Sequence, residues 1–208
     1  MKQLIYLLGT IWSYLYPQLI REKLESVKVR FFAGYKSRYF KSFGKNSTLG
    51  RHTTYIGEKY IAIGDNTHIG DYGRLTAYYH YKPTNQQFCP QVIMGNDCCI
   101  GPQSHITAIH KIVIGDNVLT GPRVLITDNA HGASVDSILD IAPSKRKLVS
   151  NGPVIIEDNV WIGEGSMIMP NVTIGKGSII AANSVVTQNI PSYCIAAGSP
   201  AKIIKKLR

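Results

Sequence analysis

The chain has 208 residues, 44% of them hydrophobic, which suits one globular unit with a sizeable core. Its four cysteines (Cys89, Cys98, Cys99 and Cys194) form no CxxC pair and no zinc-type spacing, so a reduced, cytoplasmic setting is expected. The net charge of +10 is concentrated at the ends, since residues 1–51 hold ten Lys/Arg against two acidic residues, but no nucleic-acid motif accompanies them and nucleic acid is not an expected partner.

The first predicted element is a helical, basic arm over residues 1–40. Its apolar residues fall at helical spacing: Leu4, Leu8, Ile11, Trp12 and Leu15. The stretch from residue 4 to residue 20 is too polar for a transmembrane helix, and no small-residue cleavage site follows it. Because basic residues come next, the arm fits an amphipathic helix on an anionic membrane, peripheral on the inner face. The alternative is a helix packed on its own domain or on a sister subunit.

A six-residue repeat dominates the second half of the chain. An aliphatic residue recurs at every sixth position in the series Ile156, Ile162, Ile168, Ile174, Ile180 and Val186. Earlier blocks that begin at Ile63, Met94 and Ile114 share this register. A period of six suits neither a helix nor an alternating strand. It suits a short strand plus a turn, with three such units closing a triangular coil of 18 residues whose aliphatic side chains point inward.

The coils can be counted from a marker of the form apolar-Gly/Glu-x-Asn/Asp/Gly. The marker begins at Phe43, Ile63, Met94, Ile114, Ile156 and Ile174. Two of the steps between markers exceed one coil by 13 and 24 residues. The sequence therefore predicts about six coils over residues 41–191, with loops near 78–90 and 132–153. A C-terminal loop and short helix are expected over 192–208, because Ser199 and Pro200 resemble a helix start.

These repeats resemble the hexapeptide-repeat acyltransferases. Residues 126–132 (Ile-Thr-Asp-Asn-Ala-His-Gly) resemble the catalytic-histidine segment of the maltose/galactoside acetyltransferase branch. Residues 143–163 are more similar to the O-acetyltransferases of capsule and O-antigen synthesis, and residues 180–187 and 196–202 to the family's coenzyme A segment. The resemblance implies an all-β, left-handed parallel β-helix and a homotrimer with active sites between subunits. It also implies acetyl-CoA-dependent transfer to a sugar or glycan hydroxyl, with no metal required.

The resemblance assigns the general base to His131. This histidine lies 17 residues after the marker Ile114, where the third strand of its coil meets the longer loop. In the implied chemistry, the imidazole deprotonates the acceptor hydroxyl, which attacks the thioester while a backbone N–H stabilises the oxyanion.

The remaining site residues follow from the family's motif positions. The resemblance implies that coenzyme A contacts Gly163, Ala182, Thr187, Lys202 and Lys205. The expected acceptor contacts are Asp128, Asn129 and His105. The chain departs from the family at Gln188, where a lysine is common, and around Gly101 and Ile109, which argues against a simple galactoside as the acceptor.

Three alternatives stay open. Within the acetyltransferases, the acceptor could be serine, an amino sugar or an antibiotic. A γ-class carbonic anhydrase shares the fold, and its histidine pair is similar to His105 and His110 before Ile114, although the register of the first histidine differs. A catalytically inactive hexapeptide scaffold is the third alternative, against which the intact His131-Gly132 pair argues.

Overall fold

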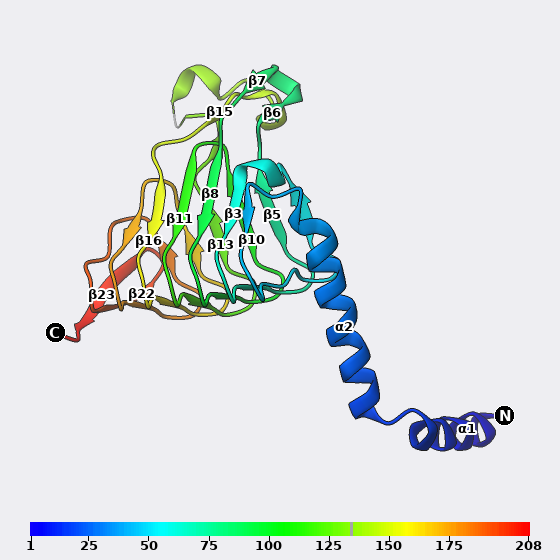
Figure 1. Ribbon diagram of the computed structural model, residues 1–208. Helices are drawn as coiled ribbons and strands as arrows, with labels where there is room; N and C mark the ends of the chain where they lie inside the picture. The colour runs from blue at the N-terminus through cyan, green and yellow to red at the C-terminus, as the bar shows by residue number, and fades with distance from the viewer. Residues whose placement is uncertain (134) are drawn as a thin grey trace.

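A computed structural model describes residues 1–133 and 135–208. The N-terminal arm consists of helices α1 (Lys2–Leu15) and α2 (Gln18–Ser37), separated by Pro17. Figure 1 shows α2 leaving one end of a strand-built prism and α1 turned across the far end of α2. No helix in the described part of the chain is both long and apolar enough to span a bilayer.

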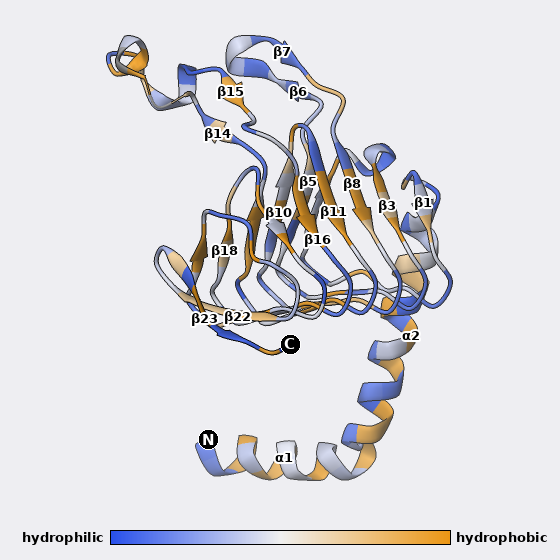
Figure 2. Cartoon of the chain, turned by 90° about the vertical axis from the view of Figure 1, so that its left-hand side faces the viewer, coloured by the Kyte–Doolittle hydropathy of each residue, from blue (hydrophilic) through white to orange (hydrophobic). Residues whose placement is uncertain are grey.

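Helix α2 contacts the prism through its last turns and through Glu25, which forms an ion pair of 2.8 Å with Arg51. Ala33 is the one buried residue of this helix. Lys36 forms an ion pair of 2.8 Å with Glu58, and the ring of Phe40, just after the helix, lies 5.4 Å from that of Phe43. The start of α2 and all of α1 extend away from the prism, as both Figure 1 and Figure 2 show.

The prism has three faces of parallel strands, and the chain passes through the first, the second and the third face in turn within each coil. The first face consists of β1 (Ser42–Phe43), β3 (Ile61–Ile63), β8 (Gln91–Met94), β11 (Lys111–Ile114), β16 (Val154–Ile156) and β19 (Thr173–Ile174). The second face consists of β4 (His68–Ile69), β9 (Cys99–Ile100), β12 (Leu119–Thr120), β17 (Trp161–Ile162), β20 (Ile179–Ile180) and β22 (Cys194–Gly198), with β23 (Ala201–Lys206) at its edge. The third face consists of β2 (Thr54–Ile56), β5 (Arg74–Ala77), β10 (His105–Ala108), β13 (Leu125–Thr127), β18 (Met167–Ile168) and β21 (Val185–Val186). Six rungs on the first and third faces confirm the predicted coil number.

The repeated aliphatic residues fill the interior in vertical stacks. On the first face, Met94 pairs with Ile114, which pairs with Ile156 on the next rung, and all three are buried. Each fully buried aliphatic side chain stabilises the fold by roughly 1.5–3 kcal/mol. In Figure 2 the hydrophobic colour lies mainly on the strands, while much of the connecting chain is hydrophilic.

The strands meet at three corners. The first corner joins the first face to the second, the second corner joins the second to the third, and the third corner returns the chain to the first face of the next coil. Turns at the first corner take positive φ at Asn66, Asn117 and Asn159, a conformation that asparagine accepts more readily than most residues. These turns keep the coils in register, so that residues one coil apart stack directly above one another.

Two segments leave the prism at the third corner. The first contains the hairpin of β6 (His80–Tyr81) and β7 (Gln86–Gln87) around the 3-10 turn η2 (Lys82–Thr84). The second runs from β14 (Ala130–His131) through η3 (Asp136–Ile138) and η4 (Pro143–Lys145) to β15 (Leu148–Val149), which pairs with β14 in antiparallel fashion. Figure 1 shows the two excursions side by side at the top of the prism.

The predicted C-terminal helix is wrong. Ala201–Lys206 is strand β23, which turns at Ser199-Pro200 and pairs antiparallel with β22. The reason is the open edge of the second face, where β22 is the last parallel rung. The N–H and C=O groups at the edge of β22 need hydrogen-bond partners, which β23 supplies and a helix would not. The β-branched pair Ile203-Ile204 also favours a strand.

Candidate functional site

The predicted base His131 is an exposed residue at the start of the larger excursion. It is held between two backbone elements, because it pairs with Leu148 of β15 and is followed by Gly132 at φ +91°. Glycine is needed at this position, since a side chain there would be strained by the backbone conformation and would meet Ile138. The imidazole is therefore accessible while its backbone is fixed.

Tyr81, from the other excursion, contacts His131. Its hydroxyl oxygen lies 3.4 Å from Nδ1 of His131, and the two rings meet edge to face with centroids 5.6 Å apart. The same hydroxyl lies 2.6 Å from the carbonyl oxygen of Ser144. The sequence did not predict this residue, although it lies 18 positions after the marker Ile63 and thus at the same corner as His131, two coils earlier.

These contacts determine how the imidazole can be protonated. A carbonyl oxygen only accepts hydrogen bonds, so the single proton of the Tyr81 hydroxyl points to Ser144. The hydroxyl oxygen can then only accept from Nδ1–H of His131. This tautomer leaves the lone pair on Nε2 free to take a proton from a bound hydroxyl.

A side-chain tether joins the two excursions. Gln86 donates from Nε2 to the carbonyl of Leu148 at 3.0 Å and accepts from the Leu148 N–H at 2.8 Å. Because Leu148 pairs with His131, this exchange fixes the hairpin that bears Tyr81 relative to the imidazole.

Asp128 does not face an acceptor, which corrects the prediction made for it. It is fully buried, and its carboxylate accepts hydrogen bonds of 2.7–2.9 Å from the backbone N–H groups of Ile109, His110 and Lys111. Those groups form the third corner one coil earlier, where the chain turns without a sheet partner. The carboxylate therefore stabilises that turn and has no free oxygen for a ligand.

The other two predicted acceptor residues lie at different corners. Asn129 is partly buried at the third corner and donates from Nδ2 to the carbonyl of Thr107 at 3.1 Å. His105 begins β10 beside the second corner, and its Nε2 is buried without a hydrogen-bond partner among the described residues. Burial, and to a smaller extent the charge of Arg74, lowers the pKa of His105 below its ordinary value. Asn129 thus lies near His131 in the chain, whereas His105 is a full strand away from that corner.

Three of the predicted coenzyme residues gather at the second corner near the C-terminal end. A Cβ on Gly163 would lie 2.5 Å from the backbone nitrogen of Ala182, so the two residues are stacked in van der Waals contact. Lys202 pairs with Ala197 of β22, and the preceding residue of that strand, Ala196, pairs with Ile180. Thr187 instead follows β21 at the third corner, and Lys205 lies farther along β23, opposite Ile195.

His131 and this second-corner cluster lie at opposite ends of the third face. A strand of that face, such as β13, separates the two corners within each coil. One chain therefore does not bring the candidate base against Gly163, Ala182 and Lys202. Among the described residues, no group of three or more His, Cys, Asp or Glu side chains is placed to hold a metal ion.

Comparison with known sequences identifies relatives over most of the chain. A family profile described as "Bacterial transferase hexapeptide (six repeats)" matches residues 153–188. WbbJ of Escherichia coli K12, which carries the name of a lipopolysaccharide biosynthesis O-acetyl transferase, is 42% identical over 169 residues, 79% of this chain and 81% of the relative. The galactoside O-acetyltransferase of the same organism is 27% identical over 195 residues, 91% of this chain and 85% of the relative.

Solved structures have the same fold. A hexapeptide-repeat acetyltransferase of Vibrio cholerae, solved with acetyl-CoA, is 26% identical with a TM-score of 0.57, covering 83% of this chain and 74% of that one. The N-acyltransferase AntD of Bacillus cereus has a TM-score of 0.66 at 22% identity, covering 84% and 89%. The predicted left-handed parallel β-helix is confirmed. The chain belongs to the hexapeptide-repeat acetyltransferase family and is an acyltransferase.

Proposed function

We propose that this acetyltransferase moves the acetyl group of acetyl-CoA to a hydroxyl of a sugar during the synthesis of a surface polysaccharide, capsule or O-antigen. The observation that carries the proposal is the accessible imidazole of His131, with Nδ1 3.4 Å from the Tyr81 hydroxyl, in a chain that is 42% identical to WbbJ over four-fifths of both sequences. An imidazole with Nε2 free suits a neutral hydroxyl acceptor, which has to lose a proton to become a nucleophile.

The reaction proceeds directly, without a covalent enzyme intermediate. Nε2 of His131 takes the proton as the sugar oxygen bonds to the thioester carbonyl carbon. The tetrahedral oxyanion then collapses, the carbon–sulfur bond breaks, and the departing thiolate takes the proton back from the imidazolium. Tyr81 holds Nδ1–H throughout, and Asn129, close to the imidazole in the chain, contacts the acceptor. A backbone N–H stabilises the oxyanion.

The donor lies along Gly163 and Ala182 of one chain, with Lys202 and Lys205 near its phosphates, and reaches Thr187 at the third corner of the neighbouring copy. Because Gly163 and Ala182 are at the second corner and His131 is at the third, a complete site needs the second corner of a neighbouring copy. A closed ring of three prisms joins each third corner to the second corner of the next chain, so the proposal includes a homotrimer. Light scattering at micromolar concentration should give three times the mass of 23.0 kDa, and a clean monomer would contradict it.

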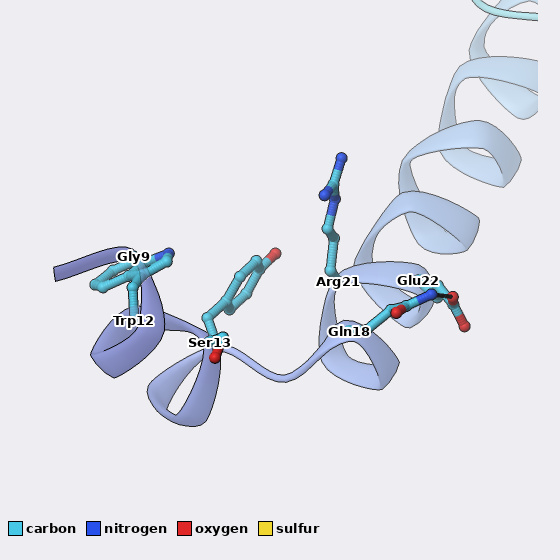
Figure 3. Close-up of a pocket in the computed structure, with 7 residues that line it drawn as sticks. Gly9, Trp12, Ser13, Gln18, Arg21 and Glu22 are labelled. Carbon is cyan, nitrogen blue, oxygen red and sulfur yellow. Dashed lines mark hydrogen bonds between the residues drawn. The ribbon is translucent and has the colours of Figure 1, made fainter. Parts of the chain in front are cut away.

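The protein works in the cytoplasm, where its donor is made, and its arm contacts the inner face of the membrane. The large apolar side chains of α1 are exposed, among them Leu8 at 57% and Trp12 at 63%. A hollow of about 720 Å³ opens between α1 and α2, and Figure 3 shows Arg21 projecting from α2 on the side where the ring of Trp12 lies. An apolar helix followed by basic residues suits an anionic lipid surface.

The membrane contact has its own test. Deleting residues 1–30 should abolish salt-sensitive binding to vesicles of anionic phospholipid. Activity on a soluble acceptor should survive, because the arm and the excursions lie at opposite ends of the view in Figures 1 and 2. If the full-length protein ignores such vesicles at low salt, the arm serves protein packing only.

The acceptor chemistry is tested on the product. Incubation with acetyl-CoA and oligosaccharides of the source organism's surface polysaccharide should add acetyl groups that mild alkali removes, because esters hydrolyse there and amides do not. Alkali-stable acetylation would instead indicate an amino-sugar acceptor. No transfer to any glycan would contradict the proposal.

A further inference from the structure

A second hollow lies beside the hairpin that bears Tyr81. It has a volume of about 450 Å³. Its lining consists of three aromatic rings and three smaller side chains: Tyr60, Tyr79, Phe88, His80, Gln87 and Cys89. The reaction described above uses none of these residues.

The aromatic rings of this hollow are ordered by a shared cation. The centroids of Tyr60 and Tyr79 are 5.8 Å apart at an interplanar angle of 36°, and Nζ of Lys59 lies 5.0 Å and 5.2 Å from them. Such a cation restrains both rings from moving. Tyr79 nevertheless keeps 45% of its surface exposed, so part of its ring is available to a ligand.

The polar groups of the hollow lie on the same hairpin. His80 pairs with Gln87, and the carbonyl of Tyr79 accepts a hydrogen bond of 2.9 Å from the N–H of Phe88. Nε2 of His80 is bound to Asn85 at 3.1 Å, which fixes the imidazole. The result is a preformed site with apolar walls and a few polar groups at its margin.

This combination suits a pyranose ring. One face of such a ring is a set of C–H groups that packs against aromatic rings, while its hydroxyl groups at the edge require amide or imidazole partners. Gln87 is exposed at the margin of the hollow, so its amide is available to a sugar hydroxyl.

The hollow and the candidate active site share one hairpin, because Tyr79 and His80 line the hollow and Tyr81 follows them directly. Tyr79 is two residues before Tyr81, whose hydroxyl is 3.4 Å from Nδ1 of His131. The Cα atoms of Tyr79 and Tyr81 are at most about 7 Å apart, so both sites move with the same hairpin.

We infer that the hollow formed by Tyr60, Tyr79 and Phe88 binds a sugar ring of the acceptor next to the ring that is acetylated. The acceptor is thus an oligosaccharide or a growing glycan and not a single sugar. This inference rests on the proposed function, since it takes the acetylated sugar to lie at His131.

The test compares binding and turnover of sized fractions of the source organism's surface polysaccharide. Tyr79→Leu should weaken binding of a trisaccharide fraction by at least about tenfold, the scale of a lost aromatic contact. It should not alter the Kd for acetyl-CoA or the weak turnover of the monosaccharide fraction. Tyr60→Phe keeps the ring and should bind normally.

Tyr39→Leu is the matched control. Tyr39 is 43% exposed and also carries Lys36 and Arg38 over its ring, but it does not line the hollow. Unchanged melting temperatures in all variants exclude a folding defect. Equal binding of the trisaccharide by wild type and Tyr79→Leu, or no glycan binding by wild type, would overturn the inference.

Binding by His131→Ala separates this inference from the proposed function. If that variant binds the trisaccharide but transfers nothing, both hold. If the wild-type protein binds it through Tyr79 and still transfers no acetyl group, the subsite stands and the proposed acceptor chemistry fails.

Discussion

The hydroxyl of Tyr81 lies between the Ser144 carbonyl, at 2.6 Å, and Nδ1 of His131, at 3.4 Å. Tyr81 belongs to one excursion from the prism, and both of its partners belong to the other. The orientation of the candidate base therefore depends on the contact between two segments that are some fifty residues apart in sequence.

Tyr81→Phe should lower kcat by roughly 5- to 30-fold, the equivalent of one lost hydrogen bond of about 1–2 kcal/mol. The KM for acetyl-CoA should stay constant, because the Tyr81 hydroxyl contacts His131 and Ser144 and none of the predicted coenzyme residues. Steady-state kinetics at one fixed pH measure both quantities.

Gln86→Met provides the control for that variant. It breaks the tether to Leu148 without touching the imidazole. An identical loss of kcat in both variants would mean that Tyr81 only fastens the two excursions together.

Asp128→Asn should destabilise the fold by about 2–4 kcal/mol, because an amide oxygen replaces a carboxylate that satisfies three buried backbone donors. The midpoint of urea unfolding measures the loss. Asp116→Asn is the comparison, because that side chain also accepts a backbone N–H, from Asn96, but is more exposed and should lose little stability. Equal midpoints for the two variants would contradict the structural role of Asp128.

The repeat explains how much of the fold could be predicted from sequence. Inward positions recur at a fixed interval, so residues such as Ile162 and Ile180 could be assigned to the core from their spacing alone. The tail could not be assigned in this way, because Ser199-Pro200 is equally compatible with a helix start and with a turn. The open sheet edge beside β22 decides between them, and that edge is a tertiary feature.

The candidate site was predictable only where a motif covers it. The motif indicated His131, but the path of the excursions is independent of the repeat, so the contact with Tyr81 could not be derived from spacing. Asp128 was misassigned because it stands beside the base in sequence. Its burial shows instead that it meets the N–H groups of the coil before it.

Because of His105, the free energy of unfolding should fall at mildly acid pH. Its folded-state pKa is lowered from the ordinary value of 6.5, so below that value the unfolded chain binds a proton that the folded chain resists. The stability that the neutral form contributes is present above pH 6.5 and is lost as pH falls toward the folded pKa. The melting temperature of the wild type should drop more between pH 7.5 and 5.5 than that of His105→Gln, and parallel curves would refute this.

Lys202→Gln should raise the Kd for coenzyme A by about five- to tenfold through the loss of one charged phosphate contact. Lys205→Gln should have a smaller effect, because Lys205 pairs with Ile195, farther from the second corner. Titration with coenzyme A and with its 3′-dephospho form measures this contact. A larger effect at Lys205 would move the nucleotide toward the other end of β23.

The central claim is that His131 is the general base, and one measurement tests it most directly. Thiol release from acetyl-CoA with a working glycan acceptor is followed for the His131→Ala, His80→Ala, His105→Ala and His110→Ala variants. His131→Ala should lose at least a hundredfold in kcat, within the usual range of about 10²–10⁴ for general acid–base catalysis, while acetyl-CoA still binds. His80→Ala should lose less than about tenfold, because its imidazole is held by Asn85 on the hairpin. Near-normal turnover by His131→Ala, or a larger loss at His80, would contradict the account.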